Sequence, residues 1–406
     1  MQTWIATEFA DTPQGKEADA ILRSCVHCGF CTAVCPTYKL LGDELDSPRG
    51  RIYQIKALLE GEEVGELTQL HLDRCLTCRA CETACPSGVQ YARLADIGRA
   101  EIEKRVPRSL RQLLLRRALR WILPSTARFG LLLKLGRTVK PLLPPALRRH
   151  IPAARPAGQW PLARHARRVL VPAGCVQPAL EPGIDSALAR LLDVHAISAL
   201  PIISGCCGAI SHHLSAAEEA RARFKANIDA WWPHIETGVE AIVISATGCG
   251  AMVREYGHLL REDKDYADKA MRVSALCRDP LELIEGLPIQ SVGQGRRVAF
   301  QAPCTLQHAL KLEGRIEAIL RQAGFEVLPV EESGVCCGSA GTYSILQPEL
   351  SAELRERKLA HLQRHEPDFI ATANIGCLAH LQAASGIPVI HWLNLLERSF
   401  NMQIKE

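Results

Sequence analysis

Eight of the 17 cysteines stand in two runs that have the same spacing, and a proline follows each run. The runs are Cys25, Cys28, Cys31 and Cys35, and Cys75, Cys78, Cys81 and Cys85. Thiolates are soft ligands that suit iron–sulfur clusters, and three cysteines separated by two residues can hold one cluster from a single loop. The fourth cysteine of each run points away from that loop and is placed to reach a second cluster.

The spacing therefore predicts two [4Fe–4S] clusters that exchange their outlying ligands. One would be held by Cys25, Cys28, Cys31 and Cys85, and the other by Cys35, Cys75, Cys78 and Cys81. Zinc sites more often use two separated pairs of ligands, so they fit these runs poorly. Four thiolates complete each cluster, so the neighbouring polar residues are expected to tune the clusters or to lie at the surface. These residues are His27, His71, Arg74 and Arg79.

The compartment also favours metal over disulfides. Residues 1–15 have no basic start, apolar run or small-residue cleavage site, so we do not expect a secretory signal. No stretch approaches 18 uncharged apolar residues, so we expect no membrane-spanning helix. We therefore expect a cytoplasmic protein, where clustered cysteines bind metal rather than pair as disulfides.

The other nine cysteines lie in residues 167–406, where the sequence repeats itself with a period near 130 residues. Each repeat supplies one cysteine, then a Cys-Cys-Gly (CCG) triplet, then one more cysteine. The candidate cofactor-binding residues are Cys175, Cys206, Cys207 and Cys249 in the first repeat, and Cys304, Cys336, Cys337 and Cys377 in the second. Adjacent cysteines strain a mutual disulfide but can share one metal. Cys277 has no counterpart and is expected to be a small buried apolar residue.

The elements that must position these residues follow from hydrophobic periodicity. Between the two N-terminal runs, Arg49–Leu59 has helical spacing, which predicts an all-α ferredoxin-like module. In the repeats, apolar runs predict strands at Val169–Ala173, Ala241–Ala246 and Phe369–Ala373. Helices are expected at Ala216–Ala230 and Glu349–Leu362. Alternating strands and helices imply parallel sheets, with ligands at the strand ends.

We therefore expect a multidomain chain in which an all-α [4Fe–4S] module precedes two tandem α/β CCG repeats with parallel sheets. The expected bounds are 1–100 for the ferredoxin-like module, 101–166 for a basic linker, 167–290 for the first CCG domain and 291–406 for the second.

The basic linker combines charge with apolar residues. Residues 101–170 contain 17 Lys or Arg and two acids, although the whole chain carries only +4. Leu110, Leu114, Ala118 and Trp121 would share one face of an amphipathic helix, with Arg116 on another. Such a helix fits an anionic membrane surface or a partner subunit, whereas no motif indicates nucleic-acid binding. The prolines at 141, 144, 145, 152, 156 and 161 predict little regular structure beyond that helix.

The repeats resemble the cysteine-rich CCG domains of heterodisulfide reductase subunits. In that family the last element is Cys-x-x-Cys, whereas Met252 and His380 stand here in place of the second cysteine. A further cluster, a zinc site, a redox-active dithiol and a structural role therefore all stay open for the CCG cysteines.

The whole chain resembles the iron–sulfur subunits of bacterial glycolate oxidases. The resemblance is carried by CVHCGFC from Cys25, LLGDELDSPRGRIY from Leu40, HLDRCLTC from His71, NIDAWWP from Asn227, CTLQHALKL from Cys304, CCGSAGTY from Cys336 and TANIGC from Thr372. It implies flavin-containing partner subunits that oxidise glycolate to glyoxylate, and also D-lactate. It further implies FAD in those partners and electron delivery toward a membrane acceptor such as quinone, from a peripheral position on the cytoplasmic face of the inner membrane.

This chain itself shows no Gly-x-Gly-x-x-Gly after a strand and no P-loop. We therefore expect no catalytic residue here, and we expect substrate oxidation in a partner subunit. Two other functions stay open: an electron-transfer subunit of a related lactate or glycerol-3-phosphate dehydrogenase, and a CCG-type thiol–disulfide reductase.

Overall fold

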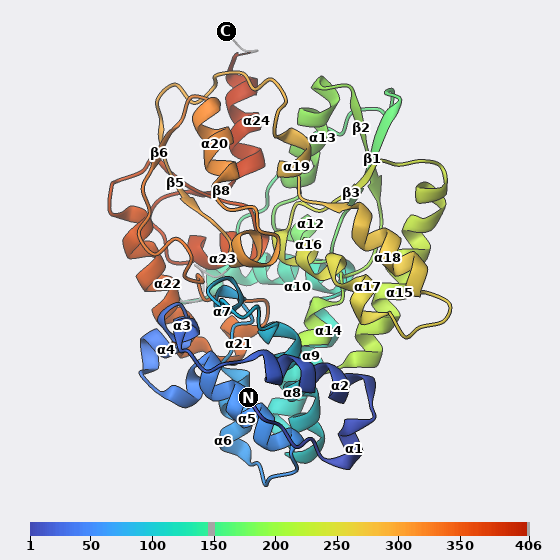
Figure 1. The fold of residues 1–406 in the computed structure, drawn as a ribbon. Helices are drawn as coiled ribbons and strands as arrows, with labels where there is room; N and C mark the ends of the chain where they lie inside the picture. Colours follow the sequence, from blue (N-terminus) through green and yellow to red (C-terminus); the bar gives the residue numbers. More distant parts are fainter. Residues whose placement is uncertain (145–150, 404–406) are drawn as a thin grey trace.

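The computed structural model describes residues 1–144 and 151–403 and places a helical N-terminal module beneath two parallel sheets (Figure 1). The module contains α1 (Thr7–Ala10), α2 (Pro13–Ser24), α3 (Phe30–Ala33), α4 (Pro36–Leu41), η1 (Glu44–Asp46), α5 (Pro48–Leu59), α6 (Glu66–Asp73), α7 (Ala80–Thr83) and α8 (Tyr91–Arg105). No strand occurs among residues 1–144, so the expected all-α arrangement is confirmed.

Local sequence signals explain the helices of the module. Ser47 caps α5 by accepting a hydrogen bond from the Gly50 amide, and Pro48 occupies the first helical position. α5 and α8 cross closely because Gly98 has no side chain, and a Cβ there would lie 2.6 Å from Ile55 Cγ1. α8 continues to Arg105, so the boundary expected at residue 100 is too early.

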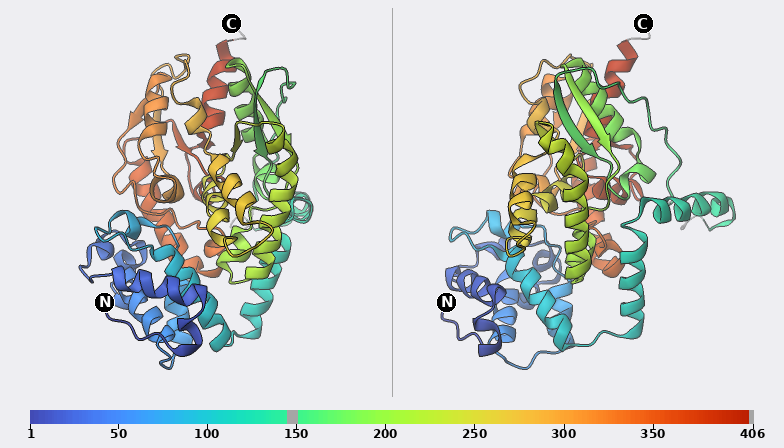
Figure 2. Two further views of the ribbon diagram at one scale, coloured as in Figure 1. Left: turned by 45° about the vertical axis from the view of Figure 1, so that its right-hand side comes forward. Right: turned by 90° about the vertical axis from the view of Figure 1, so that its right-hand side faces the viewer.

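The basic segment forms two helices, α9 (Leu110–Ile122) and α10 (Thr126–Val139), followed by a short turn, η2 (Lys140–Leu142). α10 projects from the body of the molecule (Figure 2). Residues 151–166 contain neither helix nor strand, as their prolines predict, whereas Pro145 lies outside the described residues. Within α9 the buried residues are Arg116 and Leu119, so the basic face is not simply solvated.

Each CCG repeat forms a four-stranded parallel sheet. The first has the order β2-β1-β3-β4 and the second β6-β5-β7-β8. The strands are β1 (Arg167–Pro172), β2 (Ile197–Ile202), β3 (Ala241–Val243), β4 (Cys277–Arg278), β5 (Arg297–Gln301), β6 (Glu326–Leu328), β7 (Phe369–Thr372) and β8 (Val389–His391). The matching order shows that the repeated sequence is a repeated fold, and the expected strands are present, although β3 ends at Val243.

Helices connect and cover both sheets. Those of the first repeat are α12 (Gln177–Leu180), α13 (Gly183–Val194), α14 (Ala209–His213), α15 (Ala217–Glu236), α16 (Thr247–Arg254), α17 (Tyr256–Leu259), α18 (Ala267–Leu276) and α19 (Leu281–Ile284). Those of the second are the π-helical turn η3 (Thr305–Ala309), α20 (Arg315–Gln322), α21 (Tyr343–Leu346), α22 (Pro348–Gln363), α23 (Ile375–Gln382) and α24 (Trp392–Gln403). α15 and α22 confirm the two helices expected from sequence.

The two repeats share one hydrophobic core. A single cluster of buried side chains joins Val169 and Val243 of the first sheet to Val298 and Trp392 of the second repeat. Polar contacts cross the same boundary, since the Thr305 hydroxyl lies 2.8 Å from the Thr247 hydroxyl. The two repeats are therefore two copies of a fold that pack against each other through a shared core.

Candidate metal centres

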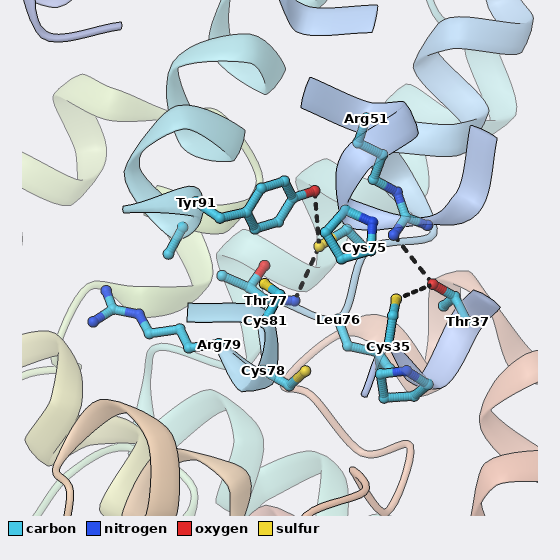
Figure 3. Close-up of a pocket in the computed structure, with 13 residues that line it drawn as sticks. Cys35, Thr37, Arg51, Cys75, Leu76, Thr77, Cys78, Arg79, Cys81 and Tyr91 are labelled. Atoms are coloured by element: carbon cyan, nitrogen blue, oxygen red, sulfur yellow. Dashed lines mark hydrogen bonds between the residues drawn. The ribbon is translucent and has the colours of Figure 1, made fainter. Parts of the chain in front are cut away.

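The structure brings together both sets of four cysteines that the spacing assigned to clusters. Cys25, Cys28, Cys31 and Cys85 line one hollow of the module, and Cys35, Cys75, Cys78 and Cys81 line a second hollow (Figure 3). Cys81 borders both, so the two hollows adjoin. In each, three thiols come from one run and one from the other, which is the exchange expected from sequence. Their role as ligands stays a prediction.

The two loops hold their cysteines with the same backbone device. Residues with positive φ flank the second cysteine of each run. They are His27 (54°) and Gly29 (86°) around Cys28, and Thr77 (53°) and Arg79 (62°) around Cys78. Non-glycine residues adopt this conformation at a cost that the surroundings must outweigh. The loop therefore curls around the hollow, and its amides can point toward sulfur, as the Thr77 N–H does to Cys75 Sγ at 3.4 Å.

A buried ionic network supports the second hollow. Arg51, which is 1% exposed, donates to the Thr37 hydroxyl at 3.1 Å and to Asp46 at 3.1 Å. Asp46 also pairs with Arg74 at 2.8 Å and with His71 at 3.1 Å. The Thr37 hydroxyl in turn lies 3.3 Å from Cys35 Sγ. The network thus places positive charge and a hydrogen bond directly behind the thiols.

The acidities of these thiols show why the hollow suits a metal. Burial, and then the neighbouring Cys304, raise the pKa of Cys78 well above its usual value. Burial opposes ionisation of Cys75 too, but the charges of Arg51 and Arg99 outweigh it and lower the pKa of that thiol. Crowded, buried thiols cannot all ionise unless a cation compensates their negative charge. A bound metal supplies that positive charge, and the cysteines then hold it as thiolates. The residues therefore fit a [4Fe–4S] cluster.

The first CCG repeat gathers its four cysteines where three parallel strands end. Cys175 follows β1, Cys206 and Cys207 follow β2, and Cys249 lies in α16 just after β3. A chain of thiol–thiol contacts runs from Cys175 through Cys206 and Cys207 to Cys249. Hydrogen bonds from the Cys175 and Cys207 thiols, helped by the Gly208 amide, lower the pKa of Cys206. Four converging thiols, one of them easily ionised, can bind a metal.

The second CCG repeat builds the same arrangement from Cys304, Cys336, Cys337 and Cys377. Cys304 Sγ and Cys336 Sγ are 4.0 Å apart. Lys358 is buried beside them, and its ammonium donates to the carbonyls of Glu332 and Ser333. A buried cation beside thiols favours their ionised form.

This second set of thiols adjoins the N-terminal module. Leu76 and Cys78 share an apolar cluster with Val335, Cys336 and Tyr343, with Cys304 packed against it. Polar contacts hold the same junction, since the Thr83 hydroxyl lies 3.0 Å from His308 Nδ1. The thiols of the second repeat are therefore the immediate neighbours of the second N-terminal hollow.

The polar residues expected near the clusters, and Cys277, lie in different environments. His71 and Arg74 belong to the Asp46 network, and Arg79 pairs with Glu255 of the first CCG repeat at 2.9 Å. His27 lines the first hollow, and burial lowers its pKa. Cys277 is fully buried in the apolar core, as predicted.

Sequence reasoning missed the support around the second hollow. Arg51 occupies a buried position in α5, and Arg99 of α8 donates to the carbonyls of Leu72 and Cys75. Tyr91 also reaches Cys75 Sγ through its hydroxyl, at 3.6 Å. The available signal was an arginine at a helical position that otherwise carries apolar residues, because Arg51 stands four residues before Ile55 and seven before Leu58.

Comparison with known proteins agrees with this geometry. A family model described as "4Fe-4S dicluster domain" matches residues 21–89, and one described as "Cysteine-rich domain" matches residues 169–254 and 298–382. The glycolate oxidase iron-sulfur subunit of Escherichia coli (strain K12) is 50% identical over 99% of this chain and 100% of its own length. A probable glycolate oxidase iron-sulfur subunit of Bacillus subtilis (strain 168) is 29% identical over 93% of this chain and 91% of its own. Lactate utilization protein A of Geobacillus kaustophilus (strain HTA426) is 26% identical over 45% of this chain and 75% of its own.

Proposed function

This chain belongs to the family of glycolate oxidase iron–sulfur subunits, and on that premise we propose that it conducts electrons within a glycolate-oxidising complex. Flavin-containing partner subunits oxidise glycolate to glyoxylate, and also D-lactate, and this chain passes the electrons toward a quinone. The observation that supports this function is the pair of adjoining hollows, each lined by all four thiols of one predicted ligand set, with Cys81 at the wall of both.

Each part of the chain has one task in this function. Bound [4Fe–4S] clusters accept and release single electrons. The thiols of Cys25, Cys28, Cys31 and Cys85 hold one cluster, and those of Cys35, Cys75, Cys78 and Cys81 hold the other. Arg51 and the Thr77 amide stabilise negative charge at the second site, where Cys35, Cys78 and Cys81 are buried. Hydrogen bonds and charge of this kind set the reduction potential.

The CCG thiols extend this role. The four thiols of the second repeat hold a metal or a further cluster, because they converge beside Cys78 with the buried ammonium of Lys358 nearby. The first repeat repeats the same ligand set. Iron and sulfide are counted on the anaerobically purified chain and on Cys336→Ala. Two clusters would give about eight irons, so a count near eight, with no zinc or other metal beside it and no change in Cys336→Ala, would contradict this assignment.

The helices α9 and α10 give the complex its place on a membrane. They expose apolar side chains that include Leu110, Leu114, Trp121, Leu131 and Leu135, and Leu142 of the η2 turn that follows is exposed as well. Residues 104–180 contain no acidic residue, so this surface attracts anionic lipids. No helix among the described residues is long and apolar enough to cross a bilayer. We therefore place the chain at the cytoplasmic face of the inner membrane, bound peripherally.

Membrane contact is tested by sedimentation with vesicles. The chain should bind vesicles that contain phosphatidylglycerol, and Leu114→Glu with Leu131→Glu should weaken that binding. Leu67→Glu is the matched control, because Leu67 is as exposed but lies on α6. Equal binding by the control and the double variant would refute the assignment of the surface.

The electron-transfer function is tested in the reconstituted complex. Glycolate added anaerobically should reduce the clusters of this chain, followed by visible absorbance and electron paramagnetic resonance. The chain without its partners should show no reduction by glycolate. Full glycolate-to-quinone activity in a complex that lacks this chain would overturn the proposal.

A lactate-oxidising complex is the second candidate. Lactate utilization protein A of several bacteria matches about half of this chain, including the relative from Geobacillus kaustophilus. Comparison of D-lactate, L-lactate and glycolate as reductants of the same complex separates the two. Rapid reduction by L-lactate with none by glycolate would favour this candidate.

A further inference from the structure

A cavity of about 340 Å³ lies between the N-terminal module and the first CCG repeat, and Thr305 and Ala309 of the second repeat also line it. α2 and α8 form its wall on the module side, and α14 to α17 form the opposite wall. Its volume is within the range of cavities that bind cofactors and other small molecules. Electron storage in the thiol sites does not require it, so it calls for a separate explanation.

The cavity reaches a predicted cluster ligand. Thr77, Cys78 and Arg79, which form the loop of the second N-terminal hollow, all line it. Thr77 and Cys78 line that hollow as well. A molecule in the cavity would therefore touch the same loop that holds the cluster, and electrons would have only the thickness of that loop to cross.

Proton-carrying groups meet in the same space. His212 Nε2 lies 3.0 Å from one oxygen of Asp96, and His213 Nδ1 lies 3.5 Å from the other. Burial opposes protonation of His212, but the charge of Asp96 outweighs it and raises the pKa of the imidazole. His212 is thus held ready as a proton donor beside the cavity.

Apolar side chains form one part of the walls. Ile97 and Ala100 contribute from α8, Phe224 from α15 and Met252 from α16. A flat ring fits this combination of aromatic and aliphatic walls, with its polar oxygens directed at the imidazole and guanidinium groups. Charged side chains, among them Arg79, Arg93 and Glu255, line the rest of the cavity, so a ring would lie against the apolar part of the wall with its oxygens toward the charged part.

We propose that this cavity binds the ring of the quinone that accepts electrons from the chain. The inference rests on the proposed function and adds the place of electron exit. Two electrons reach the ring one at a time across the Cys78 loop, and two protons join its oxygens. One proton leaves the His212 imidazolium and the other comes from solvent, so both carbonyl groups become hydroxyl groups. Solvent then returns a proton to His212.

The cavity also lies close to the surface assigned to the membrane. Ala217 and Arg221 of α15 line it, and Glu219 between them pairs with Arg120 of α9 at 2.9 Å. Ala217 is exposed, so this side of the cavity is accessible from outside. A quinone that leaves the bilayer near α9 would reach the cavity along the start of α15.

Photolabelling of the cluster-containing chain tests the site directly. A short-chain quinone that carries an azido group is irradiated with the chain, and the labelled peptides are identified by mass spectrometry. The expected label lies on peptides of α8 and α14–α16. Label confined to other peptides, or no label that excess unlabelled quinone displaces, would overturn the proposal.

A kinetic test uses two substitutions, each of which fills the cavity from a different side. Ala100→Phe places a ring on the α8 wall, and Ala217→Trp places one at the exposed edge, where folding tolerates it. Ala360→Phe is the control, because Ala360 is exposed on α22 and does not line the cavity. Photoreduced chains are reoxidised by a short-chain quinone or by ferricyanide, which needs no binding site.

The readout is the quinone rate divided by the ferricyanide rate, which corrects for any loss of clusters. Both cavity variants should lower this ratio by about tenfold or more, which corresponds to about 1.4 kcal/mol of lost interaction, and the control should leave it unchanged. Equal ratios in all variants would overturn the proposal. Glycolate-dependent reduction of the wild-type complex is measured alongside. If glycolate reduces the wild-type complex while the rate ratios stay equal, only the proposed exit site is wrong. If glycolate does not reduce the complex, the proposed function is wrong.

Discussion

Arg51 offers the sharpest test of how the module holds its second cluster. Its guanidinium makes three buried hydrogen bonds, to the His71 carbonyl at 2.7 Å, to the Thr37 hydroxyl at 3.1 Å and to Asp46 at 3.1 Å. Arg51→Met keeps most of the side-chain length and removes the charge and all three bonds. Asp46, which is 0% exposed, then keeps only Arg74 and His71 as ionic partners.

The expected loss follows from the burial of the pair. Breaking a buried ion pair by removing one partner costs about 3–5 kcal/mol. The lower value applies here, because Arg74 and His71 still compensate Asp46. If that loss raises the unfolding rate, about 3 kcal/mol corresponds to a rate of cluster loss roughly a hundredfold faster in urea. Removal of positive charge near Cys75 and Cys35 should also lower the reduction potential of the adjoining cluster.

The assay follows anaerobic bleaching of the visible absorbance after dilution into urea. Arg23→Met is the matched control, because Arg23 is 57% exposed and pairs with Asp19 at the surface. Exposed pairs of this kind contribute about 1 kcal/mol or less, so the control should bleach at nearly the wild-type rate. Equal bleaching rates for the two variants would show that the Arg51 network does not stabilise the module.

Three further predictions concern other parts of the chain. Cys28→Ser and Cys85→Ser should each remove the same cluster, and with it about four irons, although the two residues are far apart in sequence. The cluster that remains should give the same electron paramagnetic resonance spectrum in both variants. Different spectra would refute the exchange of ligands. Burial lowers the pKa of His391 to about 4, so its contribution to stability is complete above about pH 6.5 and is lost as the pH falls. His391→Gln should therefore recover about 2 kcal/mol of the stability lost between about pH 8 and pH 5, measured by urea unfolding. Gly338→Ala should displace the second CCG loop, because the φ of Gly338 is +87° and a Cβ there would lie 2.5 Å from the Ser351 carbonyl oxygen. A Cβ at Gly314 would meet open space instead. Gly314→Ala should therefore lower the free energy of unfolding only by the backbone strain, about 1 kcal/mol.

The parts of the structure that follow from sequence are those set by local spacing. The two cysteine runs predict which thiols meet, because a tight loop can present only three of its four sulfurs to one centre. The landmarks from Cys175 to Cys377 predict a duplication, and both sheets have the same strand order. Strand ends also place the thiols correctly, because parallel strands converge at one edge of a sheet.

The parts that could not be predicted depend on contacts between distant segments. Arg116 reads as a solvated residue of an amphipathic helix, yet it is buried on the module and pairs with Asp73 at 3.0 Å. The apolar side chains of α9, such as Leu114, are exposed instead. Local periodicity describes which residues share a helical face, but it does not tell which face the rest of the chain will cover.

The duplication raises the question of why two equivalent thiol sites are kept. The module is a single body, and it meets the two repeats in different ways. Beside the second repeat, Leu76 and Cys78 share an apolar cluster with Val335 and Cys336, so the contact around Cys78 is apolar and short. Beside the first repeat, the same Cys78 faces a cavity with Asp96 and His212 at its wall. An apolar contact without proton donors favours transfer of electrons alone, whereas a cavity with proton donors favours chemistry that takes electrons and protons together. Duplication therefore gives one module two different faces. In the proposed function, the asymmetry of the contacts, rather than of the thiol sets, would separate conduction within the chain from delivery to an acceptor.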